Sequence, residues 1–197
     1  LPNHATVACH ATIEMQKRGE ELRKMLREQS RPLLFTRMGL NSGPVVVGNM
    51  GSAERMDYTM MGDVVNLAAR LEGANKFYKT FSMISGSTYE LAKDDIDSRQ
   101  LDIIRVVGKN EPVPVHELLA RKNETSGEMS GVIEQYMKGL KLYQDRNFKD
   151  AIAQFEKVLT IDSEDGPSQT YIKRCGMFLE SPPEKGWDGV FTFTEKG

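Results

Sequence analysis

Cysteine, tryptophan, long apolar runs and excess charge are all scarce in this sequence of 197 residues. Its two cysteines, Cys9 and Cys175, are far apart and show neither disulfide nor metal-ligand spacing, which is typical of a reducing, cytosolic compartment. No run approaches the roughly 20 apolar residues of a membrane span, and no signal peptide is recognisable. The net charge of −2 gives no electrostatic basis for binding nucleic acid, so we expect no nucleic-acid partner.

The chain starts with LPNHATVACHA and lacks an initiator methionine. We therefore interpret it as a fragment. The sequence leaves open whether the parent protein has a membrane tether upstream. The length suffices for one domain and a smaller second unit.

The residue pattern predicts an α+β fold, in which helices pack against a mostly antiparallel sheet. Periodicity and turn residues predict, in order, a helix over 4–29, a hairpin of strands 33–40 and 45–49 around the turn Asn41-Ser42-Gly43-Pro44, a strand at 58–61, a helix from Asp63, a strand at 82–85, a helix at 87–93, and strands at 101–107 and 113–119. The acidic run DDID at 94–97 is interpreted as a solvated loop.

A second unit follows the α+β part. Residues 122–131 are polar and small and are interpreted as a linker, and 132–179 read as three short helices. Gly139, Phe148, Ala151 and Phe155 fall at the spacing of a tetratricopeptide repeat, although Gln135 replaces the usual large residue and no proline closes the second helix. An unrelated helical hairpin is the alternative. Because one repeat is too few to be stable alone, we expect the α+β part or another copy to complete its core.

The tail, 180–197, contains Trp187 and an alternating VFTFT run that reads as a short strand. It is expected to pack back on the helices or on the α+β part, and disorder is the alternative.

The stretch DYTMMGDVVNLAARLEG, residues 57–73, points to a function. On a helix with about 3.6 residues per turn, Asn66 and Arg70 lie on one face, one turn apart. The guanidinium of an arginine donates two parallel hydrogen bonds and suits phosphate. From spacing alone, an alternative is that Arg70 pairs with Glu72, Asp63 or another surface acid.

Together, RMGLNSGPVVVGNMGS and YTMMGDVVNLAARLEG resemble the second half of the catalytic domain of class III nucleotidyl cyclases, the adenylyl and guanylyl cyclases. The resemblance covers residues 1–121. It implies a ferredoxin-like antiparallel sheet of the nucleotide cyclase type, without the family's first strands, followed by the small all-α repeat-like unit.

The resemblance also implies roles for individual residues. Asn66 would orient the ribose, Arg70 would stabilise charge on the α-phosphate, Thr59 would read the base and favour ATP over GTP, and Arg37 would contact the outer phosphates. Lys109 is matched to a triphosphate-binding lysine, but imperfectly, because some relatives carry that lysine at the position of Val107.

Cofactors and partners follow from the same resemblance. The family binds two Mg²⁺ or Mn²⁺ ions through a pair of aspartates that this chain does not contain, so we expect the chain alone to be inactive. Asp57, Asp63, Asp94, Asp95, Asp97 and Asp102 show no strand-borne pairing, and a zinc site at His4, Cys9 and His10 lacks a second ligand pair. Sites in the family form between two catalytic domains, so the parent is expected to be a homodimer.

The leading hypothesis is a fragment of a bacterial adenylate cyclase that converts ATP to cyclic AMP and pyrophosphate. The helical unit would regulate it or bind a protein partner. The alternative is a non-catalytic scaffold or interaction module built on a cyclase-like domain.

Overall fold

The computed structural model describes residues 2–52, 54–105 and 112–192. Its elements, in chain order, are α1 (His4–Glu28), β1 (Met38–Leu40), β2 (Val46–Gly51), β3 (Met56–Met61), α2 (Asp63–Tyr78), β4 (Ser82–Ser85), α3 (Gly86–Ala92), β5 (Ile96–Arg105), β6 (Val113–Arg121), α4 (Gly127–Gln144), α5 (Phe148–Ile161), α6 (Gly166–Glu180) and β7 (Phe191–Thr192). The predicted α+β class is confirmed. None of the described helices has both the length and the apolar character needed to cross a membrane.

The main sheet has the strand order β1-β4-β6-β5-β7. Its central strands pair antiparallel, β4 with β6 and β6 with β5. The two edge strands are short and pair parallel to their neighbours, β1 with β4 and β7 with β5. The sheet is therefore mixed, with an antiparallel centre.

The two faces of this sheet carry two separate apolar cores. α1 and α3 cover one face through Cys9, Ile13 and Ala92, which meet Ile84 and Leu118. The other face is covered jointly by α2 and by α4, α5 and α6. Neighbouring residues of β4 alternate between the two cores, as strand geometry requires.

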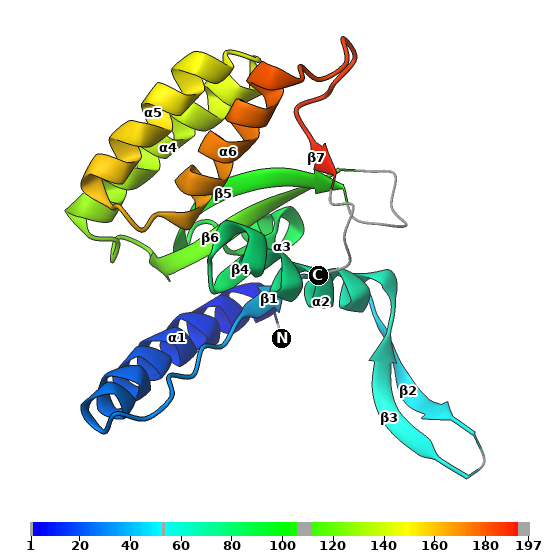
Figure 1. Cartoon of the computed structure of the whole chain (residues 1–197). Coiled ribbons are helices and arrows are strands. Elements are labelled where there is room, and N and C mark those ends of the chain that lie inside the picture. The colour runs from blue at the N-terminus through cyan, green and yellow to red at the C-terminus, as the bar shows by residue number, and fades with distance from the viewer. Residues whose placement is uncertain (1, 53, 106–111, 193–197) are drawn as a thin grey trace.

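The predicted hairpin of 33–40 with 45–49 is wrong. β1 pairs with β4, whereas β2 pairs antiparallel with β3 around the turn between Gly51 and Met56 (Figure 1). Gly51 has φ 143° there, and the Ser52 amide donates to the Arg55 carbonyl at 2.9 Å. The turn residues at 41–44 do not close a hairpin because Asn41 and Ser42 use their side chains to bind other elements.

Two predicted boundaries also differ from the structure. β5 begins at Ile96, inside the predicted acidic loop, because Ile96 is buried and the carboxylate of Asp97 accepts hydrogen bonds from Thr125. α4 begins at Gly127, inside the predicted linker, where the Ser126 hydroxyl accepts from the Met129 amide and caps the helix. The polar connection between the two parts is therefore shorter than expected.

The second unit consists of three helices, as predicted, and its core is completed by the α+β part. Tyr136, Phe155 and Tyr171 are fully buried in the same apolar cluster as Leu71 and Met83. The hydroxyls of Tyr136 and Tyr171 both donate to the Leu101 carbonyl of β5, at 2.9 and 3.0 Å. The helical unit is thus fastened to the sheet by apolar packing and by hydrogen bonds.

The tail packs back on both parts of the chain. The Trp187 ring lies 5.3 Å from that of Tyr143 and 5.1 Å from that of Phe178, measured between centroids. Beyond it, the backbone at Phe191–Thr192 pairs with β5. The prediction that the tail returns to the molecule is confirmed for the residues described.

Close contact between α4 and α5 depends on Gly139. A Cβ added there would lie 2.8 Å from the ring of Phe155. We expect Gly139→Val to lower the free energy of unfolding by about 1–3 kcal/mol, because the added atoms force the two helices apart. Urea unfolding measures this. Gly176 of α6 is the control, since a Cβ there meets nothing within 4 Å, and Gly176→Ala is expected to raise stability by about 0.5–1 kcal/mol.

A buried histidine predicts a pH dependence. His116 on β6 stacks on Tyr89 with centroids 4.1 Å apart, and burial lowers its pKa to about 4, against a small opposing effect of Glu90. Between pH 6.5 and 4 the unfolded chain binds a proton that the folded chain does not, so stability falls as the pH falls.

This loss should total at most about 3 kcal/mol at pH 4. Chemical denaturation at several pH values measures it, with His116→Phe expected to lose this part of the slope. His4→Gln, at an exposed site, is the control. An unchanged slope in His116→Phe would contradict the assignment.

Candidate functional site

α2 carries the two central candidates, Asn66 and Arg70. Leu67 and Leu71 on the same helix are buried against the sheet, whereas Asn66 and Arg70 are exposed one turn apart. α2 starts directly after Gly62, whose φ of 152° favours glycine. The local sequence thus produces a helix with one anchored face and one face that presents an amide and a guanidinium.

The N-terminal end of α2 is held by the run Asn41-Ser42-Gly43. The Asn41 side-chain amide donates to the Val64 carbonyl at 3.0 Å, and the Ser87 hydroxyl donates to the Asn41 oxygen at 3.0 Å. A Cβ on Gly43 would lie 2.4 Å from Val64. Sequence reasoning treated this run as a hairpin turn and missed that it fixes the helix of the site.

β1 supports the middle of α2 through a missing side chain. A Cβ on Gly39 would lie 2.3 Å from both the Ala68 carbonyl oxygen and the Glu72 amide nitrogen, so only glycine allows this approach. The buried Asn75 side chain donates to the Met38 carbonyl at 3.0 Å and holds the same two elements together. The run RMGLNSG draws attention to Gly39 in the sequence, whereas no pattern in the sequence points to Asn75 as a support of α2.

Arg37 lies next to α2, as a site shared with Arg70 requires. Its Nε lies 3.4 Å from Oε1 of Glu72, and both side chains are partly exposed, at 42% and 49%. An ion pair this exposed is weak, so a phosphate could replace Glu72 as the partner of Arg37. Glu72, which sequence reasoning considered as a partner for Arg70, therefore contacts Arg37.

Thr59 is placed differently from these three. Thr59 lies on β3, opposite Gly48 of β2, in a two-stranded hairpin that projects from the body beyond the start of α2 (Figure 1). The hairpin is almost entirely exposed. Within one chain, Thr59 is thus carried by a different part of the molecule from Arg37. Lys109 lies outside the described residues.

Acidic, cysteine and histidine side chains were the remaining candidates for a metal site. Nowhere in the described ranges do three His, Cys, Asp or Glu side chains gather to hold a metal ion. Asp102 is buried against Arg174, and Cys9 is buried in the core beneath α1.

A shallow cavity of about 360 Å³ lies elsewhere, between the start of β5 and α4. Lys93, Asp97, Lys122 and Thr125 are among its lining residues, and none of the predicted site residues is. Lys122 is engaged there by Asp97 and by the Lys93 carbonyl. This cavity does not belong to the candidate site.

Comparison with known proteins adds to this geometry. The model of the family described as "Adenylate and Guanylate cyclase catalytic domain" matches residues 1–120. Adenylate cyclase 1 of Rhizobium meliloti (strain 1021) is 36% identical over 116 residues, covering 59% of this chain and 17% of that protein. The terminal-differentiation specific adenylate cyclase of Dictyostelium discoideum is 32% identical over 144 residues, covering 71% of this chain and 7% of that protein. The chain thus spans less than a fifth of these relatives.

Solved structures agree with the fold. The adenylyl cyclase CyaB from P. aeruginosa is 36% identical, with a TM-score of 0.53 over 62% of each chain. The guanylyl cyclase Cya2 is 29% identical, with a TM-score of 0.50 over 62% of this chain and 61% of that one.

The close approach at Gly39 generates a prediction. Gly39→Ala should push α2 away from β1 and lower the free energy of unfolding by about 1–3 kcal/mol, because the new methyl group meets backbone atoms that cannot rotate away. Thermal or urea unfolding measures the change. Gly48→Ala in β2, where a Cβ meets nothing within 4 Å, is the matched control, and an equal effect of both substitutions would contradict the role of Gly39.

Proposed function

Because the chain belongs to the adenylate and guanylate cyclase catalytic-domain family, we propose that it forms part of an adenylate cyclase that converts ATP to cyclic AMP and pyrophosphate. The observation that carries the proposal is the exposed pair Asn66 and Arg70 on a helix whose opposite face is buried. The match of residues 1–120 to the cyclase catalytic-domain family favours the enzyme over the scaffold.

The proposed reaction is intramolecular. The ribose 3′-oxygen bonds to the α-phosphorus and gives up its proton to solvent, while the bond from that phosphorus to the bridging oxygen breaks and releases pyrophosphate. Asn66 orients the ribose, and Arg70 neutralises the charge that spreads over the α-phosphate in the transition state. Placing the reacting atoms next to each other provides much of the rate enhancement.

The other candidates complete substrate binding. Arg37 contacts the outer phosphates by exchanging Glu72 for a phosphate oxygen, and Lys109 is the further candidate for the triphosphate. Thr59 reads the base, and its hydroxyl supports adenine rather than guanine. A divalent cation, Mg²⁺ or Mn²⁺, would supply additional charge neutralisation to the complete enzyme.

A homodimer is part of the proposal. Val46, Val47, Tyr58, Met60 and Met61 on the projecting hairpin are between 52% and 76% exposed. An isolated two-stranded hairpin is marginally stable in water, and exposed apolar patches mark interaction surfaces. A second copy that covers the hairpin would bring Thr59 of one chain towards another chain's α2.

Two predictions concern the helical unit, one about its structural kinship and one about its function. Its kinship with tetratricopeptide repeats stays a prediction, because the close approach of α4 to α5 at Gly139 fits any tight helical hairpin. Binding of a protein partner by this unit is likewise a proposal. Pull-down with the α4–α6 surface altered at exposed Met137 and Met177 would test it.

The first experiment measures cyclic AMP and cyclic GMP made from ATP and GTP with Mn²⁺, for this chain and for the protein extended upstream. We expect cyclic AMP from the extended protein. Activity of the 197-residue chain alone would contradict the expected dependence on an upstream metal pair. No product from either would favour the scaffold.

Arg70→Ala is expected to lower kcat by a factor on the order of 10³, with a smaller change in KM, because the guanidinium acts mainly on transition-state charge. Arg18→Ala is the control, since Arg18 is an exposed arginine on α1 that pairs with Glu14 and Glu21. A rise in KM with unchanged kcat would mean that Arg70 only binds substrate.

A further inference from the structure

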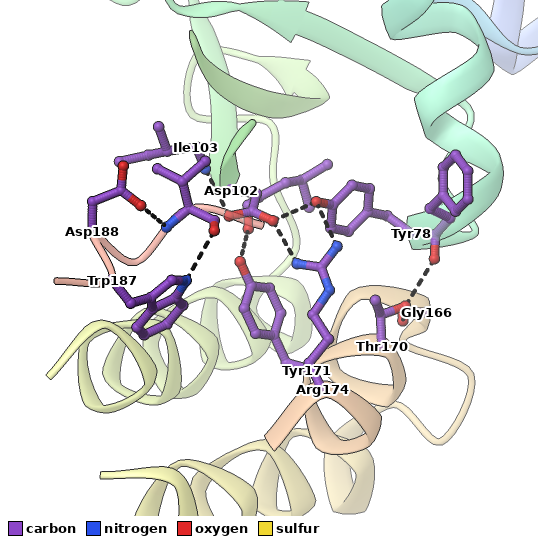
Figure 2. Close-up of polar contacts among 12 residues, drawn as sticks. Tyr78, Asp102, Ile103, Gly166, Thr170, Tyr171, Arg174, Trp187 and Asp188 are labelled. Atoms are coloured by element: carbon purple, nitrogen blue, oxygen red, sulfur yellow. Dashed lines mark hydrogen bonds and ion pairs between the residues drawn. The ribbon is translucent and has the colours of Figure 1, made fainter. Parts of the chain in front are cut away.

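α6 of the helical unit meets the C-terminal end of α2. A Cβ on Gly166 would lie 2.3 Å from the Tyr78 carbonyl oxygen, so the two helix ends are in direct contact. The Thr170 hydroxyl donates to the Phe77 carbonyl at 2.9 Å. Figure 2 shows this contact and the polar cluster beside it. The last carbonyls of α2, which have no partner within the helix, are thus in part satisfied by α6.

A buried polar cluster joins the same two helices to the sheet (Figure 2). Asp102 of β5 accepts at Oδ2 from the hydroxyl of Tyr78 at 2.5 Å and from Nη1 of Arg174 at 2.5 Å. Nη2 of Arg174 donates to the Tyr78 hydroxyl oxygen at 3.1 Å. The three side chains are at most 5% exposed and come from α2, β5 and α6.

This cluster has a fixed geometry and protonation state. Burial, with the charge of Asp102, raises the pKa of Tyr78 well above its usual value, so the hydroxyl stays protonated and donates. Removing one partner would leave a buried charge or hydroxyl unsatisfied, which is costly in a low-dielectric interior. The cluster therefore tolerates little displacement of α2 relative to α6.

We propose that α6 positions the helix of the cyclase site, with Tyr78 and Arg174 as positioning residues that act through α2. The inference rests on the proposed function. Arg70 lies eight residues before Tyr78, about 12 Å along the helix, so a tilt at the C-terminal end of α2 is transmitted to Arg70 and Asn66. Asn41 fixes the other end, and α2 is held from both sides.

The chain offers a matched control for the Tyr78 hydroxyl. Tyr136 is also fully buried, and its hydroxyl binds the Leu101 carbonyl of β5. Tyr136→Phe deletes a buried hydroxyl that joins the helical unit to β5. Tyr78→Phe deletes a buried hydroxyl that joins α2 to the same strand. They differ in that Tyr78 belongs to α2 and its hydroxyl contacts Asp102 and Arg174, whereas in Tyr136→Phe the Leu101 carbonyl keeps the hydroxyl of Tyr171.

Hydrogen–deuterium exchange of the full 197-residue chain, read by mass spectrometry, tests the positioning directly. We expect Tyr78→Phe to speed exchange in 63–78 about tenfold relative to the wild type, with 127–144 unchanged. Arg174→Lys keeps the positive charge but loses the planar guanidinium whose Nη1 and Nη2 contact Asp102 and Tyr78, and it should act in the same direction. Tyr136→Phe should leave 63–78 unchanged.

Kinetics of the cyclase supply the second readout. In the protein that makes cyclic nucleotide, Tyr78→Phe should lower kcat about tenfold with less than a twofold change in KM, because misplacement of Arg70 affects the transition state most. Tyr136→Phe should keep the wild-type kcat.

The outcomes separate the two proposals. If the wild-type protein extended upstream makes no cyclic nucleotide, the proposed function is refuted, while exchange in the 197-residue chain still decides whether α6 holds α2. Faster exchange throughout the chain in Tyr78→Phe, or the same change in Tyr136→Phe, would show a general loss of stability and overturn the positioning role. Unchanged exchange in 63–78 would overturn it as well.

Discussion

α2 alone does not cover the whole of one face of the sheet. The helical unit covers the remainder, and this shared coverage links the two parts of the chain. α2 covers β4 and β1, while α4, α5 and α6 cover the remainder, so Leu71 and Met83 share a core with Tyr136 and Phe155. Apolar burial supplies the drive for this packing. The buried ion pair of Arg174 with Asp102 makes the orientation of this packing specific, because a buried charge that loses its partner costs about 3–5 kcal/mol.

A second buried cluster shows that this join is specified by charge at more than one point. Arg99 of β5 binds Glu117 at 2.7 Å and Asp165 at 2.6 Å, and Asp165 also caps the first turn of α6. Opposing charges buried at two places on one face fix how α6 lies along β5, since sliding would unpair both clusters together. The C-terminal end of the site helix thus contacts residues of α6 that lie beyond the matched family segment, 1–120, while its start and middle are held from within that segment.

Local pattern was enough to predict the elements of the site but not its supports. The helix from Asp63, the strand at 82–85 and the helix after Ser85 have clear periodicity and caps, and each was found. Asp102 and Arg174 are 72 positions apart, and their pairing leaves no periodic signal. The hairpin was misassigned because 41–44 has good turn chemistry, yet its polar side chains bind α2 and α3 instead. The supports of α2 and the strand partner of β1 thus depend on pairing between distant segments, which a local sequence pattern does not reveal.

The proposed site also requires that Thr59 come close to Arg37 and Arg70. Arg37 and Arg70 belong to the body, whereas Thr59 lies on a hairpin that projects away from it, with both strands exposed. The exposed valines and methionines beside Thr59 favour an apolar partner surface at the arm. In the proposed homodimer, a second copy would provide that surface and bring the proposed base-reading Thr59 towards the phosphate-binding candidates of the body. The hairpin leads into α2 through Gly62, so the arm joins the site helix at the end that Asn41 holds, opposite the end that α6 contacts.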